Sequence, residues 1–203
     1  MKLYYSPGAC SLSPHIALNE AGFTYETEKV DLATKKTEKG ADFFAVNPKG
    51  YVPALALDDG AVLTEGPAIL QYLGDQKPAS GIVPKAGTME RVRAQEWLNF
   101  ITSELHKTYG PLFRPTTPDE YKKLSREYLA RRLAVLDKHL AGKQYILGDK
   151  FSAPDAYAFT VLRWSQYTGI DLSPYANIRA FMDRMNARPK VQETLKQEGL
   201  VKA

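Results

Sequence analysis

Cysteine is nearly absent from this chain, since Cys10 is the only one among 203 residues. A single thiol forms no internal disulfide and offers no zinc cluster. Long apolar runs are missing too: no segment at the N-terminus resembles a signal peptide, and none approaches the roughly 20 residues of a membrane helix. We therefore expect a cytoplasmic protein without a metal, a membrane partner or a permanently bound cofactor.

A large excess of one charge sign is also missing. The 27 basic residues face 23 acidic ones, and hydrophobic residues make up 44% of the chain, an ordinary globular composition. The two signs are interspersed, which favours a solvated surface of mixed charge over a nucleic-acid partner. A small anionic ligand remains compatible with the net charge of +4.

Short strands and helices alternate over the first eighty residues. The pattern predicts strands at 2–5, 23–30, 54–57 and 61–63, and helices at 12–21, 36–46 and 65–75. In the second strand Phe23, Tyr25 and Thr27 are expected to share one face. Thr64 is expected to cap the helix that follows it. This order of elements indicates a small α/β domain.

Residues 78–87 carry two prolines and two glycines and are predicted to be a linker. Beyond the linker, leucine and isoleucine recur at helical spacing. Ser152 and Asp155 form a capping pair that opens a helix running through Trp164. The sequence thus predicts two domains, an α/β domain over 1–80 and an all-α domain over 88–203.

Cys10 lies between the first strand and the first helix, with Ser11 or Ser13 as a possible cap and Pro14 in the first turn. The helix dipole and free N–H groups there favour thiolate over thiol, which predicts a lowered pKa. With no second cysteine, any disulfide must join Cys10 to a separate molecule. A buried packing role for Cys10 stays open at this point.

Two further segments suit a peptide-like ligand. Pro53 directly precedes a strand, and its isomer decides whether the backbone before it is free to pair with such a ligand. Glu65 and Gly66 stand at a helix N-terminus, where N–H groups bind an anion while the acid meets an ammonium. That pair suits the zwitterionic end of an amino acid. A plain trans proline and a plain helix cap are the alternatives.

These pieces, in this order, resemble the bacterial beta class of the cytosolic glutathione S-transferases. The likeness covers essentially the whole chain and rests on residues 1–15, 47–53, 63–69, 96–107, 148–157 and 198–200. It implies the glutathione S-transferase fold, a thioredoxin-like domain followed by an all-α domain. It also implies a homodimer with one glutathione site per subunit, and in thioredoxin-like folds the proline at the position of Pro53 is cis.

The resemblance also implies a set of site residues. Cys10 would lie at the sulfur of glutathione and form a mixed disulfide with it, and Cys10 and His106 would be the catalytic residues. The implied glutathione contacts are Cys10, Lys35 at the glycyl end, the Val52 backbone at the cysteinyl unit, Glu65 and Gly66 at the γ-glutamyl end, and Asn99, Ser103, Glu104 and His106 from the helical domain, with Lys107 nearby.

Helical periodicity gives the last group separate support. At about 100° per residue, Asn99, Ser103 and His106 fall within roughly 60° of one another and form a polar stripe. A solvent-exposed helix face is the alternative. An imidazole can hydrogen-bond a thiolate and carry a proton near neutral pH. His15 and His139 are instead predicted to be structural or exposed.

The family usually places its electrophile pocket between the domains. Tyr109, Phe113, Trp164 and Tyr167 are the candidates here, with plain interdomain core as the alternative for each. Some beta-class relatives carry histidine in place of Tyr167, which puts the electrophile preference in question.

The resemblance favours conjugation of glutathione to apolar electrophiles, a detoxifying reaction, in which the enzyme activates the thiol and holds both reactants. Glutathione-dependent thiol–disulfide exchange or reductive dehalogenation, with Cys10 as the nucleophile, is a second hypothesis. A non-catalytic carrier of hydrophobic ligands is a third. The presence of Cys10, Glu65 and His106 argues against a purely binding role.

Overall fold

The computed structural model describes residues 1–201 of the chain. Its first part forms a mixed sheet with strands in the order β3-β2-β1-β4-β5. β1 pairs with β2 in parallel, and the other neighbours pair antiparallel. The strands are β1 (Lys2–Tyr5), β2 (Glu26–Asp31), β3 (Lys36–Thr37), β4 (Ala54–Ala56) and β5 (Val62–Thr64). The predicted α/β fold of this part is confirmed.

The helix predicted over 36–46 is wrong. The segment holds β3 and a single 3-10 turn, Phe43–Ala45, in which the Phe44 N–H donates to the Asp42 carboxylate (3.0 Å). Gly40 between them has a φ of 83°, a backbone conformation that no α-helix contains. The local composition favoured a helix, but an α-helix cannot continue through a residue in the left-handed conformation.

The second strand is shorter than predicted, because β2 begins at Glu26 and leaves Phe23 and Tyr25 outside it. Glu28 and Val30 are the buried residues of β2, whereas Thr27 is exposed. Glu28 is buried because Lys2 on the neighbouring strand holds its carboxylate at 3.0 Å. The ion pair with Lys2 makes the burial of this acidic side chain possible. The hydrophobic pattern of the strand alone does not reveal such a partner.

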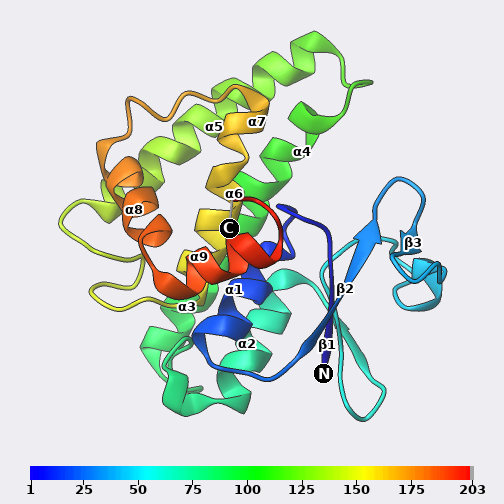
Figure 1. Ribbon diagram of the computed structural model, residues 1–203. Helices are drawn as coiled ribbons and strands as arrows, with labels where there is room; N and C mark the ends of the chain where they lie inside the picture. Colours follow the sequence, from blue (N-terminus) through cyan, green and yellow to red (C-terminus); the bar gives the residue numbers. More distant parts are fainter. Residues whose placement is uncertain (202–203) are drawn as a thin grey trace.

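Helices α1 (Leu12–Glu20) and α2 (Gly66–Gln76) lie between the sheet and the rest of the molecule (Figure 1). The predicted linker begins with a 3-10 turn, Pro78–Ser80, and then packs against α2. Ile82 and Val83 are buried, and a Cβ on Gly74 would lie 2.5 Å from Val83. Only glycine allows this close approach between α2 and the linker.

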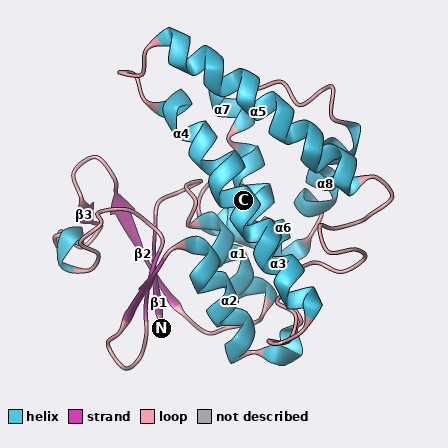
Figure 2. Cartoon of the chain, turned by 180° about the vertical axis from the view of Figure 1, so that it is seen from behind, coloured by secondary structure: helices cyan, strands magenta, loops and turns pink. Residues whose placement is uncertain are grey.

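The remainder of the described chain is helical, as predicted. It comprises α3 (Met89–Phe100), a π-helix (Ile101–His106), α4 (Lys107–Phe113), α5 (Asp119–Leu140), α6 (Ala153–Arg163), α7 (Ser165–Thr168), α8 (Ala176–Asn186) and α9 (Pro189–Gln197). Figure 2 shows the same order of layers from behind, with α1 and α2 between the sheet and the longer helices. No helix within residues 1–201 is both long and apolar enough to cross a membrane.

The start of α6 follows the predicted capping pair. Ser152 donates to Asp155 Oδ2 through both its N–H (2.8 Å) and its hydroxyl (2.6 Å), and the N–H of Ile146 donates to Oδ1 (2.7 Å). Burial nevertheless raises the pKa of Asp155 to about 6. This single carboxyl therefore fixes both the helix start and the loop before it.

One hydrophobic core joins the two parts of the chain. It includes Leu3 and Ile16 from the first part and Leu98 and Phe159 from the second. Helix α9 lies across α1 (Figure 1), and Asn19 Nδ2 donates to Thr194 Oγ1 at 2.8 Å. The sheet and the helices are therefore packed as one body at the level of side chains.

Two of the three histidines, His15 and His139, make hydrogen bonds within the fold. His15 is buried with its Nδ1 2.8 Å from Glu198 Oε1, and His139 Nε2 lies 2.8 Å from the carbonyl oxygen of Ile146. Their predicted structural roles are confirmed.

Candidate functional site

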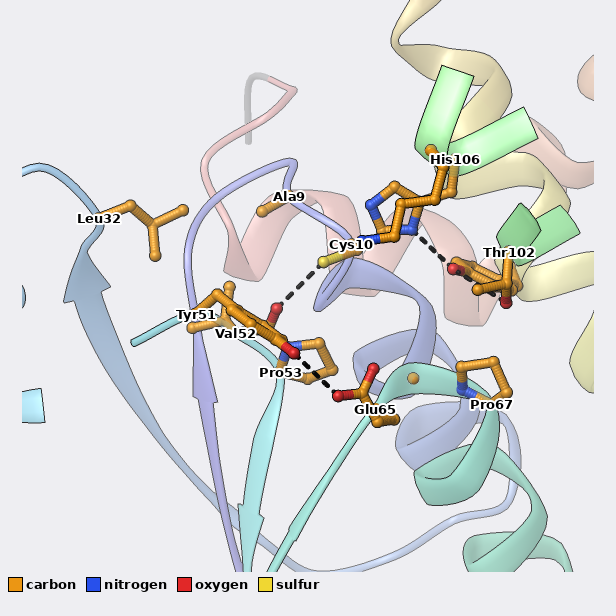
Figure 3. Close-up of a pocket in the computed structure, with 13 residues that line it drawn as sticks. Ala9, Cys10, Leu32, Tyr51, Val52, Pro53, Glu65, Pro67, Thr102 and His106 are labelled. Atoms are coloured by element: carbon orange, nitrogen blue, oxygen red, sulfur yellow. Dashed lines mark hydrogen bonds between the residues drawn. The ribbon is translucent and has the colours of Figure 1, made fainter. Parts of the chain in front are cut away.

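Two adjacent cavities lie between the sheet domain and the helices. The first cavity has a volume of about 220 Å³ and the second about 450 Å³. Both are lined by Ala9, Cys10, Leu32 and His106, so they meet at the thiol and the imidazole. Figure 3 shows these two side chains at one end of the first cavity and Glu65 at the other.

The loop before Cys10 is held at Gly8 by the helical domain. The Trp164 indole N–H donates to the Gly8 carbonyl oxygen (2.9 Å), and the Gly8 N–H donates to Glu198 Oε2 (2.9 Å). Gly8 has a φ of +70°, and a Cβ there would lie 3.4 Å from Leu200. Because Gly8 lines the second cavity, these contacts fix the cavity wall as well as the approach to Cys10.

Cys10 is half-buried and acts as a hydrogen-bond donor. Its thiol donates to the carbonyl oxygen of Val52 at 3.1 Å. Burial raises the pKa of Cys10 to about 12, and nearby N–H groups lower it by less. The negative charge of Glu65 raises this pKa as well, whereas the positive charge of Lys107 lowers it. The predicted lowering is therefore wrong, because loss of solvent outweighs the helix terminus.

The serines beside Cys10 do not cap α1. Ser11 occupies the cap position, but its hydroxyl accepts from the N–H of Ser6 (3.1 Å) and donates to the Ser6 carbonyl (3.2 Å). Ser13 donates to the carbonyl oxygen of Cys10 (2.8 Å). Both hydroxyls shape the turn that carries the thiol rather than the helix end.

Glu65 stands at the start of α2 with its carboxylate ionised. Its Oε1 accepts from Lys49 Nζ (2.6 Å) and from the Tyr51 hydroxyl (3.0 Å). The hydrogen bond from Lys49 keeps the pKa of Glu65 below its usual range. Glu65 has a φ of 69°, a conformation that costs on the order of 1–3 kcal/mol for a residue with a side chain.

The predicted cap at Thr64 is wrong, because Glu65 takes the cap position of α2 and the Thr64 hydroxyl accepts from Lys49 Nζ (2.9 Å). The first cavity therefore has a negative carboxylate directly beside the uncapped N–H groups of α2. Gly66 and Pro67 complete this end of the lining.

His106 reaches the cavities from the end of the π-helix. Its Nδ1 lies 2.6 Å from the Tyr157 hydroxyl, and its ring centroid lies 4.8 Å from that of Trp164. Burial, and after it the charge of Lys107, lower the pKa of His106 to about 4. The ring is therefore neutral at pH 7, and it does not titrate near neutral pH as the sequence led us to expect.

Not all of the residues predicted to bind glutathione line the first cavity. Cys10, Val52, Glu65, Gly66, His106 and Lys107 do; Lys35, Asn99, Ser103 and Glu104 do not. Lys35 Nζ donates to the carbonyl oxygen of Gly50 (2.7 Å). Glu104 forms an ion pair with Arg132 (2.7 Å) and accepts from the Tyr128 hydroxyl.

The π-helix explains why Asn99 and Ser103 do not share a face with His106. A π-helical turn holds more residues than an α-helical turn, so the 100° spacing used for Asn99, Ser103 and His106 does not apply here. Asn99 and Ser103 are exposed, with the Ser103 hydroxyl donating to the Asn99 carbonyl (3.0 Å). Thr102 lines the cavity in their place. A contact of Asn99 and Ser103 with glutathione stays a prediction.

Sequence analysis missed several lining residues of the first cavity, among them the polar residues Tyr51, Thr102 and Tyr157. Tyr51 directly precedes Val52, so the segment before Pro53 already contained the signal. Tyr157 contributes from buried helix α6, where its hydroxyl meets His106. Nothing local in the sequence of α6 separates this tyrosine from core residues.

The second cavity has an aromatic wall. Phe113, Trp164 and Tyr167 line it, as predicted for the electrophile pocket, but Tyr109 does not. Tyr109 is fully buried, with its hydroxyl 2.6 Å from Ser165 Oγ. The rings of His106, Tyr109 and Phe113 all pack edge-on against Trp164, because their positions fall on one face of the helix.

Comparison with known proteins covers both parts of the chain. The family model for the N-terminal domain of glutathione S-transferases matches residues 8–76, and the model for the C-terminal domain matches residues 100–189. Glutathione S-transferase GstA of Escherichia coli O157:H7 is 50% identical over 200 residues, covering 98% of this chain and 100% of that protein.

Solved structures agree over the whole length. A sphingomonad glutathione S-transferase in complex with glutathione is 51% identical with a TM-score of 0.95, covering 99% of this chain and 100% of that one. A beta-class glutathione S-transferase of Sphingomonas chungbukensis is 50% identical with a TM-score of 0.96 and the same coverage. The chain therefore belongs to the glutathione S-transferase family of enzymes and, within it, to the bacterial beta class.

Proposed function

We propose that this glutathione transferase joins glutathione to small apolar electrophiles where its two cavities meet. The observation that carries the proposal is the shared lining at Cys10 and His106. On one side lies a cavity with an ionised acid beside a helix N-terminus, and on the other a larger cavity with an aromatic wall. This pairing fits a peptide thiol on one side and an apolar partner on the other.

The first cavity offers complementary groups for glutathione. The N–H of Val52 makes no hydrogen bond within residues 1–201, so it is available to the cysteinyl unit. At the other end, Glu65 and the N-terminus of α2 suit the ammonium and the carboxylate of the γ-glutamyl group. The solved relative in complex with glutathione supports this choice of ligand.

The reaction requires a thiolate and a place for its proton. The glutathione sulfur would form a bond to an electrophilic carbon while a leaving group, such as chloride, departs with the bonding electrons and the thiol proton passes to water. Neutral His106 suits the role of a hydrogen-bond partner for this thiolate, since its ring carries a proton on one nitrogen at pH 7. The Cys10 thiol offers a second donor.

We further infer that the electrophile binds against Phe113, Trp164 and Tyr167 and that the enzyme detoxifies such compounds as a homodimer. The proposed glutathione site also includes four residues that the family resemblance implies, although none of them lines the first cavity: Lys35, Asn99, Ser103 and Glu104.

Thiol–disulfide exchange through Cys10 is the second candidate, and the position of Cys10 in both cavities favours it. The Cys10 thiolate would attack the glutathione sulfur of a mixed disulfide between glutathione and another thiol, form a protein–glutathione mixed disulfide and release that other thiol. A second glutathione thiolate would then free Cys10 and leave as glutathione disulfide. The raised pKa of Cys10 makes this route slow at neutral pH. Reductive dehalogenation would use the same sulfur.

Comparing Cys10→Ala and His106→Ala at saturating glutathione tests these assignments. Conjugation is followed with a chlorodinitrobenzene and disulfide reduction with hydroxyethyl disulfide. We expect Cys10→Ala to retain part of the conjugation but to lose the reductase activity and the glutathionyl mass adduct. We expect His106→Ala to lower conjugation by about 10²-fold.

The opposite pattern, loss of conjugation in Cys10→Ala with no effect of His106→Ala, would make Cys10 the central group for both reactions. A wild-type protein that binds both ligands but turns over neither substrate would instead be the non-catalytic carrier.

A further inference from the structure

The second cavity contains one charged side chain, Arg114, and the proposed reaction does not use it. The other lining residues are uncharged at neutral pH, including the His106 ring, and no acidic side chain is among them. A lone guanidinium in an otherwise uncharged lining gives the cavity a positive potential. The adjoining Lys107 on the wall of the first cavity adds charge of the same sign.

Arg114 is not used to hold the fold together. Within residues 1–201 its guanidinium has no carboxylate within ion-pair distance and no hydrogen-bond acceptor, and it stacks on no aromatic ring. By contrast, Arg188 holds Glu20 through two hydrogen bonds of 2.7 Å, and Arg91 is buried against Asp75. All five donors of Arg114 are therefore available to a ligand.

The backbone at Arg114 is nevertheless well defined. Arg114 ends α4, where its N–H donates to the carbonyl oxygen of Pro111 (3.4 Å) and its φ and ψ are −89° and 118°. These angles are the extended ones that a following proline, here Pro115, imposes. A position fixed in this way loses less entropy when a ligand binds than a position in a flexible loop would.

Helix α4 separates the guanidinium from the reacting groups. His106 directly precedes α4 and Arg114 directly follows it, a rise of about 12 Å along the helix axis. An arginine side chain and one substituted aromatic ring together span such a distance. A ring whose reactive carbon lies at Cys10 and His106 would therefore point its far substituent toward Arg114.

We propose that the second cavity selects electrophiles that carry an anionic group, such as a carboxylate, on the side opposite the reacting carbon, and that Arg114 is the residue that recognises it. This inference rests on the proposed conjugation and names the substrate class within it. The planar guanidinium pairs with a carboxylate through two parallel hydrogen bonds, which would also orient the ring.

The test uses two electrophiles with the same leaving group, a chlorodinitrobenzoate and its methyl ester. We expect Arg114→Gln to lower kcat/KM for the carboxylate about three- to tenfold while leaving the ester unchanged. Arg114→Lys should restore part of the preference, and raised ionic strength should reduce it in the wild type. Arg131→Gln removes the same charge from an exposed site outside this cavity and should affect neither substrate.

Equal loss for acid and ester, or no change with either, would overturn the role of Arg114. A binding measurement distinguishes this outcome from failure of the proposed conjugation, because it does not depend on turnover. Nitrobenzoate and its methyl ester, titrated calorimetrically in the presence of glutathione, should show the same dependence on Arg114. If neither chlorinated compound is turned over but this binding preference is found, anion selection stands and conjugation fails.

Discussion

Cys10 and His106 occupy the same end of the first cavity, and burial acts on both in favour of the uncharged form. It raises the pKa of the thiol to about 12 and lowers the pKa of the imidazole to about 4. Before glutathione binds, the reacting end of the site therefore carries two neutral hydrogen-bonding groups at pH 7. The charges that remain in the lining of the first cavity are those of Lys107 and of Glu65 at the other end.

This pair of shifts predicts slow alkylation of Cys10. The rate with iodoacetamide should fall below that of a free cysteine at pH 7.5 and should show no inflection between pH 7 and 9.5, because the thiolate forms only at higher pH. Mass spectrometry follows the reaction without ambiguity, since the chain has no other thiol. An inflection below about 8.5, the value of an unperturbed cysteine, would show that the helix terminus dominates and would strengthen the disulfide-exchange route.

Some properties of the individual site residues could be predicted from the sequence, and others could not. The positions of Cys10, Val52 and Glu65 follow from local signals, because strand ends, a proline and a helix start are read from neighbours. The direction of the Cys10 pKa does not follow, since it depends on how much solvent the opposing helices exclude. For the same reason Arg114 gave no signal: a free guanidinium is recognised only when its surroundings are known.

Among the elements, the π-helix Ile101–His106 has the largest effect on the site. It turns Thr102 and His106 toward the first cavity while Asn99 and Ser103 remain exposed. Periodicity analysis assumes that one regular α-helix runs through Asn99, Ser103 and His106, and it cannot detect an inserted residue in a turn. Four of the five strands and most helices were predictable, because a glycine, a proline or a capping residue stands near one end of most of them. The segment 36–46 was not, because Gly40 in its middle adopts a left-handed conformation.

Helix α9 and the residue after it hold the loop of Cys10, so Glu198→Ala should destabilise the fold. Glu198 is buried and accepts from the Gly8 N–H while its other oxygen lies 2.8 Å from His15 Nδ1. Its removal leaves buried polar groups unpaired, at a cost of about 2–4 kcal/mol in the free energy of unfolding. Urea titration measures this loss.

Glu193→Ala is the matched control, because Glu193 on α9 pairs only with Lys190 in an exposed ion pair. It should cost less than about 1 kcal/mol. Equal effects of the two variants would mean that the contact between Glu198 and Gly8 contributes little to stability.

At the scale of the whole molecule, the site exists only because two domains of different architecture share one core. The loop of Cys10 is fixed by Trp164 and Glu198 from the helical domain. Both cavities take their lining from each domain. A shared core that includes Leu3, Leu98 and Phe159 predicts that the domains unfold together.

The chain contains natural probes for this prediction, because its one thiol lies in the first domain and both tryptophans, Trp97 and Trp164, lie in the second. Urea unfolding followed by tryptophan fluorescence and by brief pulses of maleimide labelling at Cys10 should give the same midpoint at one protein concentration. S-methylglutathione, which lacks a free thiol, should move both midpoints equally, since the proposed glutathione site takes its residues from each domain. At a hundredfold excess over its Kd the gain is about 2.7 kcal/mol. If Cys10 is labelled at lower urea than the fluorescence transition, the first domain opens alone, and the contacts at Gly8 are not the ones that couple the two halves.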